Sequence, residues 1–238
     1  MDISKLPKNR EIILLASLRK LKISLDLDYA SLTRKLINEV YEKLCPINIH
    51  VPTFNYDFLN KGIYNYYNSE SQVGRFSEEF RREYKMNRNY DPVFSYTSML
   101  NENINDKKWC KKAFERNSFF EKIDKINFLV INIDLPSFKS TLVHYLENKY
   151  KVPYRYDKKF KGIITTKNTS FDFIYKYYVR NLNINSSYNG NKLGHYLKEK
   201  SILKNSSIFN ANIQWYNSDE LIFHFSSVIK KNINFFID

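Results

Sequence analysis

The stretch "EIILLASL", residues 11–18, is a continuous run of mostly aliphatic side chains with one charge at its start. So short and apolar a run is typical of a strand that is buried on both faces, as in a parallel sheet. The next segment, "YASLTRKLINEVYEKL" (29–44), repeats apolar residues at helical spacing, and "INIHVPTF" (47–54) alternates until Pro52 ends it. The first fifty residues therefore predict a strand, a helix and a second strand, with the first strand inside the sheet.

Another buried strand is predicted at "INFLVINI" (126–133), which leads into the helical stretch "STLVHYLENKY" (140–150). A further helix is predicted at "SEEFRREYKM" (77–86), with Ser77 as its N-cap and basic residues in its last turn. Alternating strands and helices indicate the α/β class. We expect a layered α/β/α domain with a central mixed sheet, in one domain over residues 1–238.

The remaining segments have weaker patterns. Residues 55–105 are polar, aromatic and mostly without periodicity, and long irregular segments in compact domains tend to be functional. "SFFEKI" (118–123) predicts the start of a helix and "KGIITT" (161–166) a strand. Near the C-terminus we predict a helix at "FDFIYKYYVRNL" (171–182) and a terminal helix over 218–236.

The composition narrows the classes of partner. Lysine and arginine exceed aspartate and glutamate by 13 in the 238 residues, which favours nucleic acid, membrane surfaces or phosphorylated ligands. Codon bias toward Lys, Asn, Ile and Tyr explains the same excess without any function. The two cysteines, Cys45 and Cys110, lack metal-ligand spacing, which indicates a reduced, cytoplasmic chain and no metal site. No apolar stretch approaches eighteen residues, so neither a signal peptide nor a membrane span is expected.

His144 and Glu147 stand three apart in the predicted helix at 140–150. Residues at this spacing share a helix face, so Glu147 can accept a hydrogen bond from one imidazole nitrogen and orient the other as a general base. A solvated surface pair is the alternative interpretation. The pair follows a buried strand, and ligands of α/β sheets bind at the carboxyl ends of the strands.

Other residues give weaker signals. Asp91 precedes Pro92, which is turn chemistry, although an aspartate held this way could contact the imidazole of His144. Gly74 precedes a predicted helix whose free N–H groups could meet an anion. The other histidines have no acidic or cysteine partner at ligand spacing, and we interpret them as core or surface residues: His50, His195 and His224.

Six stretches, in their order along the chain, together resemble the aminoglycoside 3-N-acetyltransferase family. That family also includes acetyltransferases associated with amino-sugar and polysaccharide biosynthesis, and it is distinct from the GNAT superfamily. The resemblance runs from about residue 13 to the C-terminus. The stretches are "VPTFNYDF" (51–58), "SESQVGRFSEEFRR" (69–82), "RNYDPVFSY" (88–96), "NSFFEKI" (117–123), "STLVHYLE" (140–147) and "KVPYRY" (151–156).

The resemblance implies a site and a reaction. His144 matches the family's general base, Glu147 the acid of its H-x-x-E pattern, and Asp91 a position where members have His-Pro or Asp-Pro. Acetyl-coenzyme A is the implied cosubstrate, and the implied mechanism is direct transfer to an amine without a covalent enzyme intermediate or a metal. The positions that match the family's coenzyme A cleft are Ser17, Thr53, Phe54, Ser71 and Gly74.

Three functions follow as hypotheses. The first is an acetyl-coenzyme A dependent N-acetyltransferase of an amino sugar, with a small-molecule substrate, no membrane or nucleic-acid partner, and a homodimer as one possible assembly. A nucleotide-linked sugar is favoured over an aminoglycoside, since polycations suit an acidic cleft. The second is a non-catalytic relative that binds a sugar or partner, because the family's His-Ser-Ser is reduced to Ser17 and its glycine-rich loop is replaced by "NIDLPSFKS" (132–140). The third, suggested by charge and tyrosines, is a nucleic-acid-binding protein.

Overall fold

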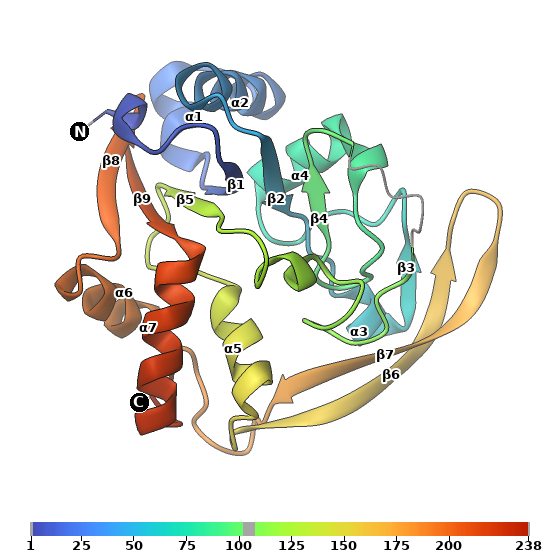
Figure 1. The fold of residues 1–238 in the computed structure, drawn as a ribbon. Helices are drawn as coiled ribbons and strands as arrows, with labels where there is room; N and C mark the ends of the chain where they lie inside the picture. Colours follow the sequence, from blue (N-terminus) through green and yellow to red (C-terminus); the bar gives the residue numbers. More distant parts are fainter. Residues whose placement is uncertain (1, 102–107, 238) are drawn as a thin grey trace.

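A computed structural model describes residues 2–101 and 108–237 of the chain (Figure 1). Its central sheet has six strands in the order β4-β2-β1-β5-β9-β8. β1 runs parallel to both β2 and β5, whereas β4, β9 and β8 pair antiparallel with their neighbours, so the sheet is mixed as predicted. The bounds are β1 Glu11–Ala16, β2 Asn48–Pro52, β4 Tyr96–Ser98, β5 Leu129–Ile133, β8 Lys204–Ile208 and β9 Ala211–Asn217.

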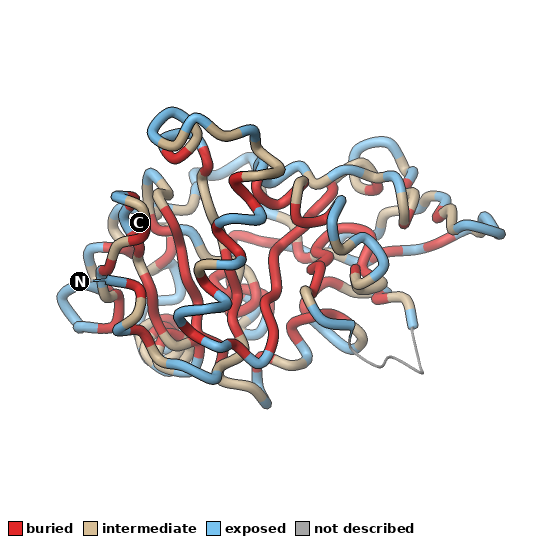
Figure 2. Tube along the Cα trace, turned by 90° about the horizontal axis from the view of Figure 1, so that it is seen from above, coloured by how far each residue is buried: buried red, intermediate tan, exposed pale blue. Residues whose placement is uncertain are grey.

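The strand β1 lies between two parallel neighbours, which explains its continuous apolar sequence. Successive side chains point to opposite faces of the sheet. Ile12 and Leu14 therefore enter one core, and Ile13, with the half-buried Leu15, enters the other. In Figure 2 the buried part of the trace runs through the centre of the molecule, along these strands.

Helices cover both faces of the sheet, which gives the predicted α/β/α layering (Figure 1). One core includes residues of α1, α2 and α4; the other includes residues of α3, α5, α6 and α7. The helix bounds are α1 Arg19–Leu25, α2 Tyr29–Leu44, α3 Asp57–Lys61, α4 Arg75–Glu83, α5 Leu142–Tyr150, α6 Gly190–Glu199 and α7 Ser218–Lys231, with short 3-10 turns at η1 Ile3–Lys5, η2 Lys85–Asn87 and η3 Phe119–Lys122.

A second sheet extends to one side of the molecule as a long hairpin (Figure 1). It consists of β3 Ile63–Asn65, β6 Arg155–Thr165 and β7 Ser170–Arg180, in the order β3-β6-β7. The helix predicted at 171–182 is therefore wrong. Alternate aromatic side chains of β7 face the core, a period of two that suits a strand and that the apolar content of the segment concealed: Phe171, Phe173, Tyr175 and Tyr177.

Several helix boundaries also differ from the sequence-based expectation. α4 begins at Arg75 with Gly74 as its N-cap, so Ser77 lies inside the helix and is not the cap. Gly74 has a φ of 127°, a conformation that side chains with a Cβ rarely adopt. "SFFEKI" forms only the turn η3, and α7 ends at Lys231.

The segment 55–105 contains three short helical elements and two short strands, although its residues 102–105 lie outside the described part of the chain. Within residues 2–101 and 108–237, no helix has the length and apolar content needed to cross a membrane. The same residues contain no cluster of histidine, cysteine, aspartate or glutamate side chains that could hold a metal ion.

Candidate active site

The parallel strands β1, β2 and β5 end at one edge of the central sheet, and a cleft of about 750 Å³ opens there. Its walls come from the strand ends, the loop before α4 and the start of α4, Phe94, the loop from β5 into the first turn of α5, and the segment before α6. Its position agrees with the expectation that ligands bind at the carboxyl ends of parallel strands. The cleft is lined by Leu15, Ala16, Pro52, Phe54, Tyr56, Gln72, Val73, Ser77, Phe94, Leu135, Ser137, Lys139, Ser140, Thr141, His144, Tyr188 and Gly190.

His144 lies in the first turn of α5 and faces this cleft with 31% of its side chain exposed. Its Nδ1 is 2.6 Å from Oε2 of Glu147, whose side chain is only 2% exposed. An ionised carboxylate can only accept a hydrogen bond, so Nδ1 carries the proton and Nε2 holds the lone pair. The pair is thus one buried carboxylate behind one accessible imidazole, and not a solvated surface pair.

Arg155, the first residue of β6, completes this group. Its guanidinium donates to Oε2 of Glu147 at 2.8 Å and to the carbonyl of Tyr178 at 3.1 Å. Nη2 of Arg155 also lies 3.0 Å from Nδ1 of His144, because both groups donate to the same carboxylate of Glu147. Burial by itself raises the pKa of Glu147, but the hydrogen bond from His144 and the charges of His144 and Arg155 lower the pKa overall. Glu147 therefore stays ionised.

Sequence reasoning did not identify Arg155 or Tyr188 as site residues. Arg155 stands in "KVPYRY", where a lone arginine among aromatic residues was the available signal. The ring of Tyr188 lies 6.2 Å from the imidazole of His144, and its hydroxyl donates to the carbonyl of Phe138 at 3.1 Å. Burial raises the pKa of this hydroxyl, so Tyr188 is a neutral wall of the cleft.

Alternate residues at the end of β2 line the cleft. Pro52 and Phe54 line it, and Phe54 packs edge-on against Phe94 with ring centroids 5.3 Å apart. Thr53 does not line the cleft. Its side chain is buried toward β4, where Oγ1 lies 3.1 Å from Oγ1 of Thr97. The structure thus separates the two residues that the resemblance assigned to one surface.

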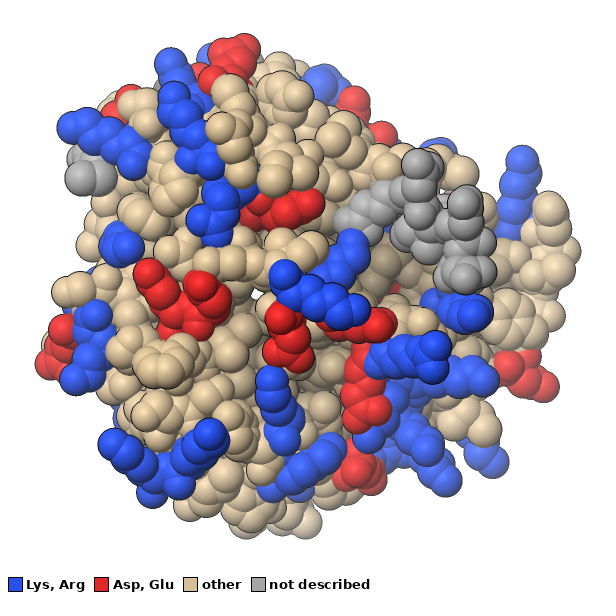
Figure 3. Space-filling model, in the orientation of Figure 1, with Lys and Arg blue, Asp and Glu red and all other residues tan. Residues whose placement is uncertain are grey.

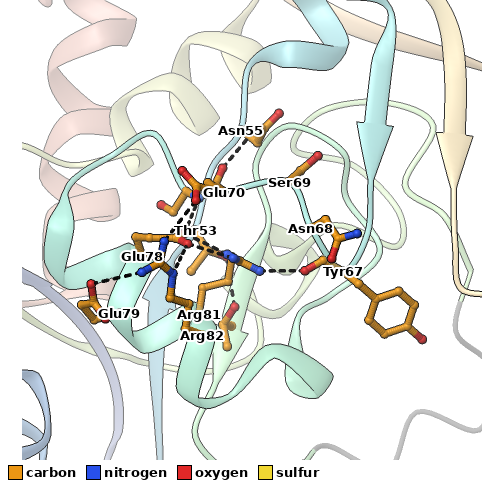
Figure 4. A network of polar contacts seen from close by, with 12 residues as sticks. Thr53, Asn55, Tyr67, Asn68, Ser69, Glu70, Glu78, Glu79, Arg81 and Arg82 are labelled. Atoms are coloured by element: carbon orange, nitrogen blue, oxygen red, sulfur yellow. Dashed lines mark hydrogen bonds and ion pairs between the residues drawn. The ribbon is translucent and has the colours of Figure 1, made fainter. Parts of the chain in front are cut away.

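The loop before α4 is fixed by the network in Figure 4, whose centre is Glu78. This carboxylate accepts hydrogen bonds from the backbone N–H of Ser71 at 2.6 Å, from Arg81 at 2.8 Å and from Arg82 at 2.8 Å. The network holds the turn so that Gln72 and Val73 line the cleft. Ser71 and Gly74 are not among the cleft-lining residues; their backbone shapes the turn.

Asp91 is not brought to His144. Its carboxylate is fully buried and accepts hydrogen bonds from the backbone N–H groups of Val93 and Phe94, both at 2.9 Å, and from the hydroxyl of Tyr175 at 3.0 Å. Burial raises its pKa. The expected contact with the imidazole is therefore wrong, and the turn interpretation describes this residue.

The profile described as "Aminoglycoside 3-N-acetyltransferase" matches residues 45–230, which is most of the chain. The chain belongs to the aminoglycoside 3-N-acetyltransferase family. It is therefore an N-acetyltransferase, as its resemblance to this family implied. No curated protein sequence gives a significant match to it.

Solved structures share the fold of this acetyltransferase at low sequence identity. The YokD protein from Bacillus subtilis has 15% identity and a TM-score of 0.69, with 96% of this chain and 95% of that chain covered. The apoenzyme of aminoglycoside acetyltransferase AAC(3)-IVa has 15% identity and a TM-score of 0.70, covering 98% and 86%. AAC-IIIb in its binary structure with CoASH has 12% identity and a TM-score of 0.71, covering 95% and 92%.

Ser17 of the acetyltransferase lies in a second pocket, of about 630 Å³, that adjoins the cleft at Leu135, a residue common to both. Its charged lining residues are Arg19, Lys20, Lys198 and Asp134, and Asp134 pairs with Lys20 at 2.9 Å. It also contains buried side-chain oxygens of Asn132 and Gln214 that have no hydrogen-bond partner in the described part of the chain. The pocket thus offers cations and hydrogen-bond acceptors together.

His50 has an acidic partner after all. Its Nε2 lies 2.7 Å from Oε2 of Glu11 on the neighbouring strand β1, and its Nδ1 lies 2.8 Å from the hydroxyl of Ser98 on β4. His50 itself is 1% exposed, so the interpretation as a core histidine is right although its partner was not foreseen. His195 pairs with Glu199 on the exposed face of α6 at 3.1 Å.

Proposed function

We propose that this enzyme transfers the acetyl group of acetyl-coenzyme A to the amine of an amino sugar, with His144 as the general base. The observation that carries the proposal is an imidazole that faces the cleft while its Nδ1 donates to a buried carboxylate, Glu147, at 2.6 Å. Such a partner fixes the tautomer and stabilises the imidazolium that forms during proton transfer.

His144, Glu147 and Arg155 have separate roles in the proposed acetyl transfer. When bound, acetyl-coenzyme A supplies the electrophile, the carbonyl carbon of its thioester. Nε2 of His144 removes a proton from the acceptor amine as its nitrogen bonds to that carbon, and His144 returns the proton to the sulfur as the C–S bond breaks. Glu147 stabilises the transient imidazolium, and Arg155 keeps Glu147 ionised. Direct transfer requires no nucleophile from the enzyme.

The second pocket is our proposed place for the phosphates of coenzyme A. Arg19 and Lys198 supply positive charge, whereas the charge of Lys20 is offset by its ion pair with Asp134 at 2.9 Å. The unpaired oxygens of Asn132 and Gln214 can accept hydrogen bonds from hydroxyl and amide groups. The pocket adjoins the cleft, so a long cosubstrate can reach from one to the other. The binary structure of AAC-IIIb with CoASH supports coenzyme A as the ligand.

The test is a thiol-release assay with acetyl-coenzyme A and a panel of amino sugars, with mass spectrometry to identify an N-acetylated product. We expect one free thiol for each acetylated amine. Calorimetric binding of coenzyme A without thiol release for any acceptor would favour the non-catalytic relative instead.

A further inference from the structure

The charge of the cleft differs from what a polycationic substrate needs. Among the residues that line it in the described part of the chain, Lys139 and His144 are basic and none is acidic. Glu147 is the carboxylate behind His144, but it is 2% exposed and already accepts from His144 and Arg155. A second or third ammonium group of an acceptor would therefore lose hydration without meeting a counter-charge.

Acidic residues on the segments around the cleft are also occupied. Asp57 of α3 pairs with Lys61 at 3.0 Å, and Glu70 of the loop before α4 pairs with Arg82 at 3.1 Å. Asp134, which follows β5, pairs with Lys20 at 2.9 Å. These ion pairs leave no unengaged carboxylate at these three positions.

The net charge of the chain does not by itself give the charge of the cleft. Basic side chains gather over the β6–β7 hairpin in Figure 3. The exposed lysines of that hairpin are outside the cleft: Lys158, Lys159, Lys161 and Lys176. The local lining, and not the total of +13, decides which acceptors fit.

Lys139 is the cleft's available cation. It is exposed, and no carboxylate within residues 2–101 and 108–237 lies in ion-pair contact with it. Its backbone carbonyl accepts a hydrogen bond from the amide of Asn132 at 3.1 Å, which ties its loop to β5. The side chains of Ser137, Ser140 and Thr141 beside it are uncharged and suited to sugar hydroxyls.

On the basis of the proposed function, we infer that the acceptor is an amino sugar with a single amine and a phosphate group, and that Lys139 receives the phosphate. The single amine reaches Nε2 of His144, and the phosphate offsets the positive charge of Lys139. A sugar phosphate and a nucleoside-diphosphate sugar share this chemistry. An aminoglycoside does not, because it carries several ammonium groups and no anion.

The experiment compares kcat/KM for gentamicin, D-glucosamine, glucosamine 6-phosphate and UDP-glucosamine, each with saturating acetyl-coenzyme A. We expect a phosphate-bearing acceptor to exceed both gentamicin and D-glucosamine, and the last two probes to distinguish a sugar phosphate from a nucleotide sugar. A higher kcat/KM for gentamicin would overturn the inference and leave the proposed function standing. No thiol release with any acceptor would overturn the proposed function, and this inference with it.

A charge-reversal variant sharpens the test. Lys139→Glu should lower the ratio of kcat/KM for the better phosphate-bearing acceptor to kcat/KM for D-glucosamine by about tenfold, because attraction becomes repulsion. The matched control is Lys8→Glu, which makes the same change in net charge at an exposed residue before the amino end of β1. An unchanged ratio in Lys139→Glu, or an equal fall in Lys8→Glu, would contradict the role of Lys139.

Discussion

Two histidine–glutamate pairs of almost equal length occupy opposite edges of the central sheet. His144 lies 2.6 Å from Glu147 beyond the carboxyl end of β5, and His50 lies 2.7 Å from Glu11 near the amino end of β1. In the first pair the imidazole is 31% exposed and the carboxylate 2%; in the second the imidazole is 1% exposed and the carboxylate 20%. The order of burial is reversed.

This reversal separates the histidine that we propose as the general base from a structural one. Both nitrogens of His50 have partners, Ser98 and Glu11, so it has no position at which to meet a substrate. At His144, the hydrogen bond to Glu147 and the close approach of Arg155 both involve Nδ1, which leaves Nε2 for the cleft. A short contact to a carboxylate therefore does not identify a general base unless the other nitrogen is accessible.

The largest expected effect is on the rate at the exposed pair. His144→Ala should lower kcat by roughly 10²- to 10⁴-fold, because it removes the proposed base, while the Kd for coenzyme A stays near that of the parent. Thiol release and calorimetry measure the two quantities. Glu147→Gln should cost less, since it disturbs orientation but keeps the imidazole. Equal rates in His144→Ala and the parent would end the assignment of the base.

The next effect concerns Arg155, which forms an ion pair with Glu147 at 2.8 Å. Arg155→Ala should lower the free energy of unfolding by about 3–5 kcal/mol, because it leaves the buried carboxylate of Glu147 with His144 as its remaining partner. Urea denaturation measures this loss. Arg155→Lys keeps the charge but not the planar fork of donors, so it should fall between Arg155→Ala and the parent. A loss as small as that of an exposed ion pair would show that Glu147 does not depend on Arg155.

The structural histidine should give the opposite pattern. His50→Ala should cost about 2–4 kcal/mol of unfolding free energy, because it leaves a cavity and removes the partner of Ser98. The kcat of the folded variant should remain close to that of the parent. His195→Ala, at an exposed pair on α6, is the control and should change stability by less than about 0.5 kcal/mol. A large fall in kcat with unchanged stability in His50→Ala would contradict this division of roles.

The smallest expected effect is a loss of unfolding free energy at low pH, because acid protonates the carboxylates of both pairs. The hydrogen bond from His50 lowers the pKa of Glu11, and at Glu147 the contacts with His144 and Arg155 outweigh burial and lower the pKa as well. A carboxyl group with a lowered pKa in the folded state stabilises the fold above its unfolded pKa, about 4.3, and loses this contribution as the pH falls through the folded value. Urea titrations between pH 5 and pH 3 should therefore show a shallower loss of stability in Glu147→Gln and in Glu11→Gln than in the parent. Parallel slopes in all three proteins would contradict these shifts.

Much of the central fold was predictable from local pattern. The runs at 11–18 and 126–133 are apolar because their strands lie between neighbours with both faces covered, and α2 keeps the predicted bounds of Tyr29–Leu44. The hairpin strand β7 was not predictable in the same way. Its core-facing aromatic residues alternate, but apolar residues such as Ile174 and Val179 stand between or after them and conceal the period of two.

The candidate site divides along the same line. His144 and Glu147 could be paired from the sequence, because a spacing of three on a helix is itself a contact distance. The position of Asp91 could not be predicted, because an aspartate before a proline occurs both in active sites and in buried turns. Its contact with Tyr175, far along the chain, shows that it belongs to a buried turn. The alternation of Pro52, Thr53 and Phe54 at the end of β2 similarly required β4, toward which Thr53 turns.

The sequence by itself determined the α/β class, the innermost strand, the family resemblance and the contact of His144 with Glu147 within α5. The last of these follows because backbone geometry fixes the distance between residues of the same helix. Only the tertiary structure decided that Arg155 reaches Glu147, that Glu11 reaches His50, and that the described residues lining the cleft include Lys139 but no carboxylate. These contacts join residues far apart in the chain. Their distances follow from how the sheet, its helices and the hairpin pack together, which no local spacing encodes.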